Sequence, residues 1–228
     1  MAFQISPGVN VSEIDLTTVV PAVSTTAGGY AGQFQWGPVG KLRLITNETG
    51  LVSTFGAPDS NTATSFFSAA NFLAYGNNLS IVRAVGSSAK NASGGTAVLV
   101  DNSDTFQYSY LNNNNSNTYG AFVARYAGSL GNSLEVQVCD NATDFATWDY
   151  KSYFTSAPGT SEFVSNAGGA QDEMHIVVID QDGLFTGVAN TVLETFAFVS
   201  KASDASNNGT SNYYKQVVFE QSKYVFAV

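Results

Sequence analysis

The sequence predicts a mixed α/β (α+β) fold: a sheet with packed helices, a β-rich segment and an extended N-terminal arm. Two observations lead to this prediction. In residues 42–85, a strand pattern is followed by two helical patterns and then by a run rich in β-branched residues. From residue 134 onward, strand-like apolar runs separated by turn residues predominate. The predicted divisions are the arm 1–27, the first part of an α/β core 28–86, a loop-rich insertion 87–119 and a β-rich remainder 120–228.

The first expected strand covers residues 42–45. Leu42 and Leu44 alternate there with basic residues, which is typical of a half-buried strand. Asn47 then supplies a helix N-cap, because its side chain can accept a hydrogen bond from a free backbone N–H. Gly56 ends this short helix, since glycine readily adopts the backbone conformation found after a helix.

A second helix, capped by Asp59 or Ser60, is indicated by an apolar stripe at positions i, i+4 and i+7. It ends at Gly76, and residues 79–85 follow as a strand. We expect residues 42–45 and 79–85 to share one sheet with this helix packed on it. The stripe that we expect to be buried consists of Phe66, Ala70 and Leu73.

The rest of the chain reads mostly as strands. The run Asn112–Asn115 predicts a loop tip, because asparagine favours turns. Residues 212–221 are typical of a short helix. The expected strands are 96–100, 106–111, 134–138, 174–179, 184–200 (one long strand or a pair) and 223–228.

The charge is distributed unevenly along the 228 residues. The net charge is −9, and the acidic and basic residues of positions 1–100 cancel, so the whole excess lies in 101–228. An acidic chain is a poor candidate for direct nucleic-acid binding, which needs Lys and Arg at the phosphates. We expect no membrane span and no signal peptide, because no apolar run approaches the roughly 20 residues that a spanning helix requires.

We expect no catalytic residue, no metal ion and no cofactor. His175 is the single histidine and has no second ligand or nucleophile in an obvious pattern, so we interpret it as a structural residue. Cys139, the single cysteine, reads as a small core residue. Asp180–Gly183 contains an Asp-Gly turn but fails the spacing of a calcium loop. Trp36, beside a Gly-Pro turn, is interpreted as a packing residue.

The N-terminal arm combines the turn residues Ser6-Pro7-Gly8 with a short strand-like pattern over residues 9–16. Such a strand needs a sheet edge to complete. Two interpretations stay open on the residues alone: the strand pairs with its own domain, or it pairs with another copy of the chain.

A set of short motifs is distributed along the chain: Phe34–Pro38, Thr46-Asn47-Glu48, Leu51-Val52, Phe55-Gly56 with Pro58, Asn71-Phe72-Leu73, Tyr75-Gly76-Asn77, Val82–Val85 and Ser211–Val228. Together these motifs resemble the tail sheath proteins of contractile-tail bacteriophages, in their N-terminal portion. Ala127–Asn132 also resembles a turn element of that family, although Ala127 stands where the family has proline.

The resemblance implies a structural subunit rather than an enzyme. Such subunits form stacked hexameric rings in a helical sheath around an inner tail tube, and contraction drives the tube through the host envelope. The implied partners are further copies, the tube protein, and baseplate and tail terminator proteins, without nucleic acid or membrane insertion. The implied location is the virion, after assembly in the host cytoplasm.

The resemblance also favours an arm that joins another subunit, and it covers only the first part of a typical sheath subunit, so we expect the core to continue beyond residue 228. The residues expected in the inter-subunit arm are Ser6, Pro7, Gly8, Val9, Val11, Glu13, Ile14 and Leu16. Two alternatives stay open: the sheath of a bacterial contractile injection particle, and a glycan-binding surface or adhesion module.

Overall fold

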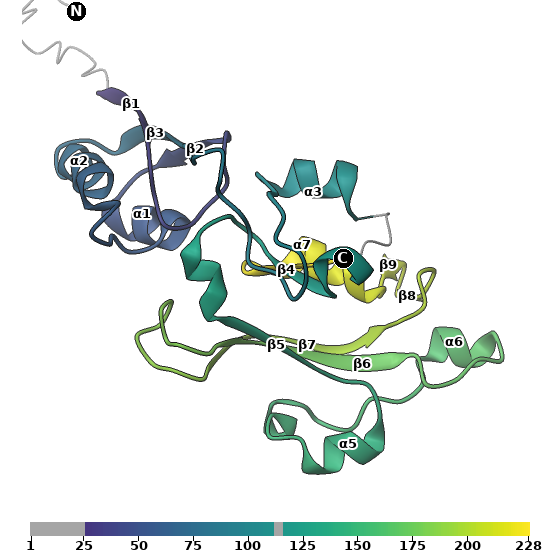
Figure 1. Cartoon of the computed structure of the whole chain (residues 1–228). Coiled ribbons are helices and arrows are strands. Elements are labelled where there is room, and N and C mark those ends of the chain that lie inside the picture. Colours follow the sequence, from purple (N-terminus) through teal and green to yellow (C-terminus); the bar gives the residue numbers. More distant parts are fainter. Residues whose placement is uncertain (1–25, 112–115) are drawn as a thin grey trace, which may run out of the picture.

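The computed structural model describes residues 26–111 and 116–228, which form two lobes (Figure 1). The predicted arm, including its eight named residues, and the Asn112–Asn115 loop tip therefore lie outside the described residues, apart from the last positions of the arm. Within the described part of the chain, no helix is long and apolar enough to cross a membrane.

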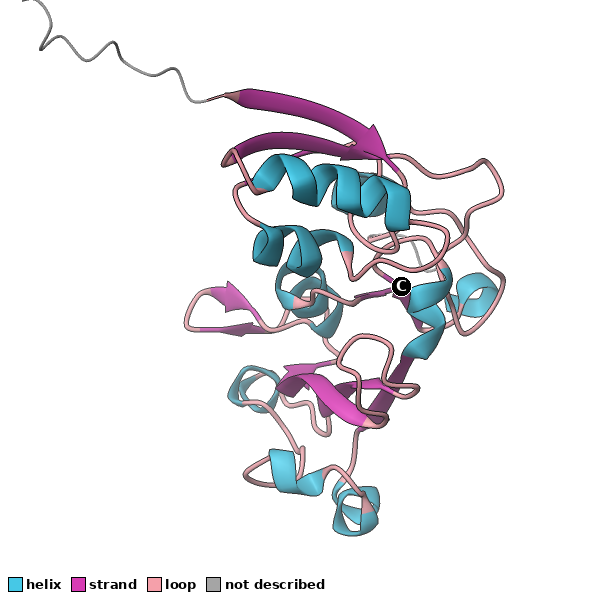
Figure 2. Ribbon diagram, turned by 90° about the vertical axis from the view of Figure 1, so that its left-hand side faces the viewer, coloured by secondary structure: helices cyan, strands magenta, loops and turns pink. Residues whose placement is uncertain are grey.

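The first lobe is a three-stranded sheet with helices on one face (Figures 1 and 2). The strand order is β1-β3-β2, with β1 parallel and β2 antiparallel to the central β3. The predicted pairing of residues 42–45 with the later strand is confirmed. The elements are β1 (Ala27–Gly32), β2 (Leu42–Ile45), α1 (Glu48–Phe55), α2 (Ala63–Leu73) and β3 (Asn78–Arg83).

Local chemistry sets the helix ends in this lobe. The Asn47 side chain accepts a hydrogen bond from the Gly50 N–H at 2.7 Å, as expected of an N-cap, and α1 ends at Gly56. Asp59 organises the turn before α2 by accepting from the Thr62 N–H at 2.8 Å, although the helix itself begins after Thr62. The Thr62 hydroxyl also donates to the Asp59 carboxylate at 2.7 Å, and this hydrogen bond, together with those from backbone N–H groups, holds the pKa of Asp59 below its usual value.

Three expectations about this lobe were wrong in detail. β2 is an edge strand whose Leu42 and Leu44 are 67% and 60% exposed, because they lie on the sheet face opposite the helices. On α2, Phe66 is buried with Ala69, whereas Ala70 and Leu73 are only partly buried against the same core. The buried side of α2 therefore passes through Phe66 and Ala69, one residue away from the predicted stripe.

β1 was missed entirely, because Ala27–Gly32 has almost no side chains to give an apolar pattern. The structure supplies the reason for at least one glycine. A Cβ on Gly28 would come within 2.7 Å of the Phe72 ring of α2. The strand therefore needs a glycine there to approach the helix closely.

The second lobe is built on a sheet of order β5-β6-β7, all antiparallel, beside a small β10-β4 pair. The expected strands 134–138 and 174–179 and the helix 212–221 are confirmed. Its helices and 3-10 turns are α3 (Ser103–Ser109), α4 (Ser116–Tyr119), η2 (Ser129–Ser133), α5 (Ala142–Thr147), η3 (Lys151–Tyr153), α6 (Glu162–Asn166) and α7 (Tyr214–Gln221). Its strands are β4 (Phe122–Ala124), β5 (Leu134–Cys139), β6 (Glu173–Asp180), β7 (Thr191–Ser200), β8 (Ser206–Asn207), β9 (Thr210–Ser211) and β10 (Val225–Ala227).

β6 is buried on both sides. One side, with Ile176 and Val178, packs against α7 and β10 in a hydrophobic core. The other side is covered by residues 140–172, a segment that leaves β5, carries α5 and α6 and returns to β6 (Figure 1). This lobe closes both faces of its central strand.

Two predicted strands of this lobe were wrong. Residues 106–111 lie largely in helix α3, because Asn102 caps it by accepting hydrogen bonds from Asp104 and Thr105, and Phe106 is buried against Phe226. Residues 96–100 make only an isolated bridge between Val98 and Asn91. The stretch 184–200 is a loop followed by β7 from Thr191 onward.

Candidate interaction surface

The residues predicted to join subunits lie outside the described part of the chain, so the structure places none of them. What it does show is how the first lobe is fixed to the second and which of its surfaces lack a covering element. These two features define the candidate interaction surface.

Arg83, the last residue of β3, fixes the two lobes together. Its side chain is buried and donates to the backbone oxygens of Phe34 (2.9 Å) and Gly37 (2.8 Å) in the first lobe. Its Nη2 also reaches the oxygens of Gln35 (3.1 Å) and of Ala127 (2.6 Å) in the second lobe. Burial lowers the pKa of Arg83 to about 10, so the guanidinium stays charged at neutral pH.

Trp36 fills the space between the lobes. It is 5% exposed and packs edge-on against Tyr126 at 5.2 Å and Phe185 at 5.1 Å. This confirms its interpretation as a packing residue. Gly128 permits the close approach of the two lobes, because a Cβ there would lie 2.9 Å from the Gln35 oxygen, and its φ of 133° is one that side chains disfavour.

The sheet face opposite α1 and α2 is the open surface of the first lobe. β1 and β3 contribute small residues to it, among them Gly29, Ala31 and Ser80. Leu42 and Leu44 stand on the same face and are the most exposed leucines there. We call these five residues the open sheet face. A flat apolar face with small neighbours suits contact with another protein surface rather than enclosure of a small molecule.

A cleft of about 740 Å³ adjoins this face along the edge strand β2. Exposed Leu44 and Leu184 line it. It also carries the basic residues Arg43, Arg125 and Lys223 together with the acidic Glu220. The cleft therefore combines apolar and cationic groups next to a strand that has a free edge.

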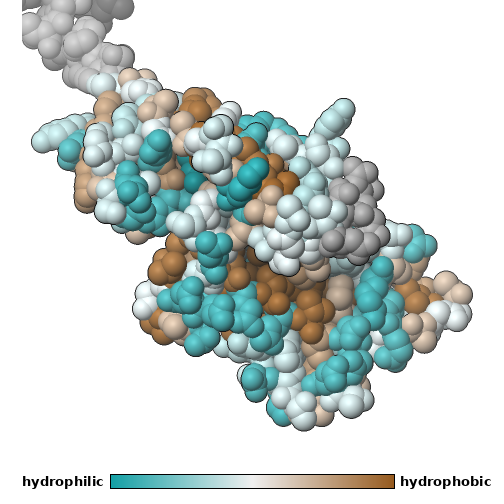
Figure 3. Space-filling view, in the orientation of Figure 1, coloured by the Kyte–Doolittle hydropathy of each residue, from teal (hydrophilic) through white to brown (hydrophobic). Residues whose placement is uncertain are grey.

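A second hollow lies over β4 and β5, where apolar residues gather in the middle of the face seen in Figure 3. It measures about 430 Å³, and its apolar lining includes Phe122, Leu134 and Val136.

The residues that the sequence analysis considered for catalysis or metal binding make structural contacts in the fold. Asp180 is buried and accepts hydrogen bonds from Ser133 Oγ (2.6 Å) and from the Thr186 N–H (2.8 Å) and hydroxyl (2.9 Å). These hydrogen bonds outweigh burial and hold the pKa of Asp180 below its usual value. The carboxylate thus fixes the loop that joins β6 to β7.

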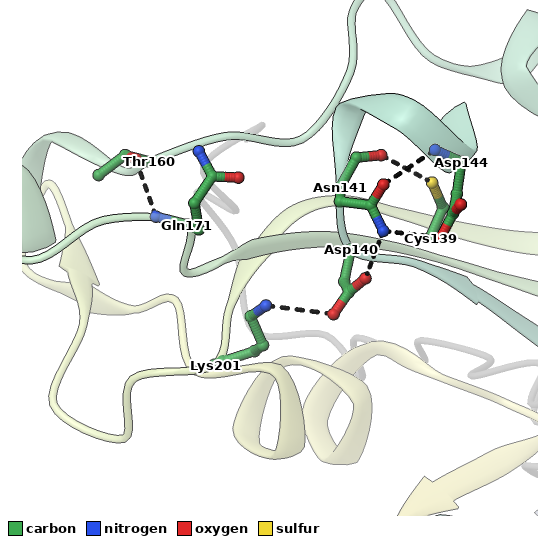
Figure 4. Close-up of polar contacts among 7 residues, drawn as sticks. All are labelled: Cys139, Asp140, Asn141, Asp144, Thr160, Gln171 and Lys201. Atoms are coloured by element: carbon green, nitrogen blue, oxygen red, sulfur yellow. Dashed lines mark hydrogen bonds and ion pairs between the residues drawn. The ribbon is translucent and has the colours of Figure 1, made fainter. Parts of the chain in front are cut away.

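Cys139 ends β5 as predicted, and its thiol lies 3.5 Å from the Asn141 oxygen (Figure 4). Burial raises the pKa of this thiol, which makes it a poor nucleophile at neutral pH. His175 is buried within an aromatic cluster. In the described ranges, no three His, Cys, Asp or Glu side chains are grouped to hold a metal ion.

Sequence reasoning missed the role of Arg83. It treated the Val82–Val85 motif as a landmark only. The signal was present, because in β3 Leu79, Ile81 and Arg83 share one face, and a cation on an otherwise apolar face needs many hydrogen-bond acceptors.

A family model described as "Tail sheath protein Gp18 domain III N-terminal region" matches residues 25–84, which is the first lobe. A tail sheath protein of Salmonella phage ViI is 35% identical over 194 residues, which is 84% of this chain and 28% of that protein. The chain is a relative of bacteriophage tail sheath proteins. The tail sheath protein of Enterobacteria phage T4 is 48% identical over 90 residues, 39% of this chain and 14% of that protein.

The sheath relationship covers most of this chain, but the chain spans less than a third of the length of these sheath relatives. Among solved structures, the sheath tail protein Lin1278 from Listeria innocua aligns over 88% of this chain and 30% of its own, with a TM-score of 0.41 and 14% identity. The similarity to sheath proteins rests on the sequence matches and not on this weak structural likeness.

Proposed function

We propose that this chain is part of a contractile-tail sheath subunit, which polymerises around an inner tail tube and contracts to drive the tube through the host envelope. The observation that carries the proposal is the open sheet face in the lobe that the sheath family model matches. Leu42 and Leu44 would be costly to leave in water, at roughly 1.5–3 kcal/mol for burying one such side chain. A polymer of identical subunits would cover them.

The proposed assembly is a helical stack of hexameric rings. A head-to-tail interface whose rotation does not close produces a helical tube, and a sheath of this kind meets the tube protein inside and the baseplate and tail terminator at its ends. In this proposal the subunit belongs to the virion, is assembled in the host cytoplasm and catalyses no reaction.

The N-terminal arm is the proposed connector. Residues 6–16 would add a strand to another copy, because their alternating apolar residues need a sheet edge and Pro7 and Gly8 favour an extended chain. Main-chain hydrogen bonds made by such a strand would keep neighbours connected while the globular parts move. We also propose that residues 87–119 are a short, loop-rich insertion within the sheath core.

Deletion of residues 1–20 tests the connector. We expect the thermal unfolding midpoint of the globular part to change little, since in the described ranges the hydrophobic cores are formed by residues 30 onward. Tubes seen by electron microscopy with the intact chain should disappear. Tubes of normal length from the deleted chain would contradict the connector, and collapse of the globular part would show that the arm belongs to its own domain.

A further inference from the structure

The only histidine in the chain lies, fully buried, beside an irregularity in the second sheet. His175 is in β6, and the register of β6 with β7 shifts between Met174 and Ile176. Opposite this shift, Phe198 adopts a φ of 54°, in the left-handed region that an aromatic residue rarely occupies. The backbone strain at Phe198 needs a compensating interaction.

Both nitrogens of the His175 ring are engaged by backbone groups. The Phe198 N–H donates to Nδ1 at 3.1 Å, and Nε2 lies 2.9 Å from the Ser156 oxygen. Because Nδ1 must accept, Nε2 must carry the proton that is donated to Ser156. The neutral ring therefore satisfies the N–H of the strained residue on one side and holds the 140–172 segment on the other.

We call residues 140–172 the strap. Its aromatic side chains surround the His175 ring: Phe154 stacks on it at 4.1 Å, and Phe145 lies edge-on at 5.7 Å. No residue of α5, η3 or α6 is buried, so the strap adds little to the core of the lobe. The Trp148 ring N–H also donates to Gln137 of β5 at 3.1 Å, and the Gly159 N–H donates to the Glu173 carboxylate of β6 at 3.0 Å. His175 is the contact between strap and sheet that lies inside the aromatic cluster.

The two ends of the strap are tied separately, and Figure 4 shows the tie between Asp140 and Lys201. At one end, Asp140 pairs with Lys201 at 3.3 Å. At the other end, the Asp172 carboxylate accepts from the Ser200 hydroxyl of β7 at 2.5 Å, and the Asp172 backbone oxygen accepts from the Lys201 N–H at 2.8 Å. Within the strap, the Thr160 hydroxyl accepts from the Gln171 N–H at 2.9 Å. The middle of the strap can therefore separate from the sheet while its ends stay attached.

We propose that the strap is an acid-released cover, held closed by neutral His175 and opened when that ring is protonated. Protonation would place an N–H at Nδ1 directly against the Phe198 N–H. It would also put a cation into a fully buried position. A cation–π contact with the face of the Phe154 ring offsets part of the free-energy cost of burying the charged ring. It does not replace Nδ1 as the hydrogen-bond acceptor for the Phe198 N–H.

Few charged groups are positioned to offset the cation. Glu173 in β6 favours the protonated ring, but its carboxylate already accepts from the Gly159 N–H. From β5 the ring faces Cys139, and α5 brings Asp144 next to Phe145. The groups nearest the ring from β7 and from the middle of the strap, Phe198, Phe154 and Ser156, are uncharged.

The direction of the effect follows from burial. Desolvation lowers the pKa of His175 below its ordinary 6.5, so the closed strap binds the proton less well than the open strap. Closure is therefore complete above about pH 6.5 and is lost as the pH falls through the lower, closed-state value. Opening would expose Val177 and Ile179, which share the His175 face of β6 and are fully buried when the strap is closed.

The experiment uses the intact chain and follows hydrogen exchange of residues 140–172 and of the Phe198 amide between pH 7.5 and pH 5, corrected for intrinsic exchange. The single histidine gives one ring signal by NMR, so its titration can be followed directly. The matched control is His175→Gln, whose amide can donate to Ser156 and accept from Phe198 without titrating. The buried aspartates do not interfere, because the pKa values of Asp172 and Asp180 lie below 3.8.

We expect opening of the strap to increase about tenfold for each unit between the open-state and closed-state pKa values, with little change in His175→Gln. The ring signal should titrate together with the loss of protection. An equal increase in His175→Gln would overturn the proposal. So would a ring that stays neutral until the whole lobe unfolds, or a ring that titrates while the strap stays protected.

Discussion

The two lobes treat their sheets differently. The second lobe covers both faces of its central strand, with α7 and β10 on one side and the strap on the other. The first lobe covers one face with α1 and α2 and leaves Leu42 and Leu44 exposed on the other. In the proposed assembly, the first lobe meets a neighbouring copy through these exposed residues, and the second lobe is the scaffold to which it is fixed.

The largest expected effect comes from breaking the attachment between the lobes. Arg83→Ala leaves four backbone oxygens without their donor, and we expect a loss of about 3–5 kcal/mol in the free energy of unfolding. Arg83→Lys should recover only part of it, because an ammonium cannot reach all four oxygens. Urea unfolding measures both, and a loss below about 1 kcal/mol for Arg83→Ala would show that the lobes do not depend on this residue.

A matched pair of core variants compares the two sheets. Ile81 in β3 and Ile176 in β6 are both fully buried. We expect each Ile→Ala change to cost about 2–5 kcal/mol, with the larger loss at Ile176, because β6 is enclosed on both faces and its surroundings can relax less. Equal losses of unfolding free energy, or a larger loss at Ile81, would mean that the first sheet does not relax more than the second, despite its open face.

The buried carboxylate of the second lobe predicts an acid dependence. The hydrogen bonds to Asp180 lower its pKa, so the stability that they provide is present above its ordinary value of about 3.8 and is lost as the pH falls through the lower, folded-state value. Asp180→Asn should cost about 1–3 kcal/mol at pH 7 and flatten this decline. Thermal melting between pH 6 and pH 2.5 gives both curves. An unchanged acid slope in the variant would rule out Asp180 as the source.

The smallest effect on folding is expected at the open sheet face. Leu42→Ser with Leu44→Ser should change the free energy of unfolding by no more than about 0.5 kcal/mol, because both side chains are exposed. Assembly should nevertheless weaken. Tyr108→Ser is the matched control, since Tyr108 is 92% exposed on α3 in the other lobe. Sedimentation velocity distinguishes the two variants, and equal behaviour would exclude this face from the interface.

The sequence predicted the elements with strong local signals and missed those fixed by distant contacts. The Asn47 cap, the Gly56 end and the apolar run of β6 act within a few residues, so their patterns are readable. β1 can form because glycine, with no side chain, allows α2 to pack closely against it. α3 is stabilised as a helix because Phe106 stacks on Phe226, a residue near the C-terminal end of the sequence. Such causes lie outside any local window.

The candidate interaction surface was likewise predicted only in part from the sequence. Leu42 and Leu44 were found as strand residues, but a period of two does not say which face is covered. Their exposure follows from the absence of a covering element in the described residues, which only the structure shows. The arm was predicted from its alternation, lies outside the described residues and stays a prediction.

Hydrogen exchange of the intact chain, compared between its dispersed and assembled states, tests the difference between the lobes most directly. The account predicts new protection in residues 42–45 and 78–83 of the first sheet, while residues 173–180, already enclosed on both faces, change little. Protection gained in the second sheet instead, or an assembled state in which residues 42–45 exchange as fast as before, would contradict it.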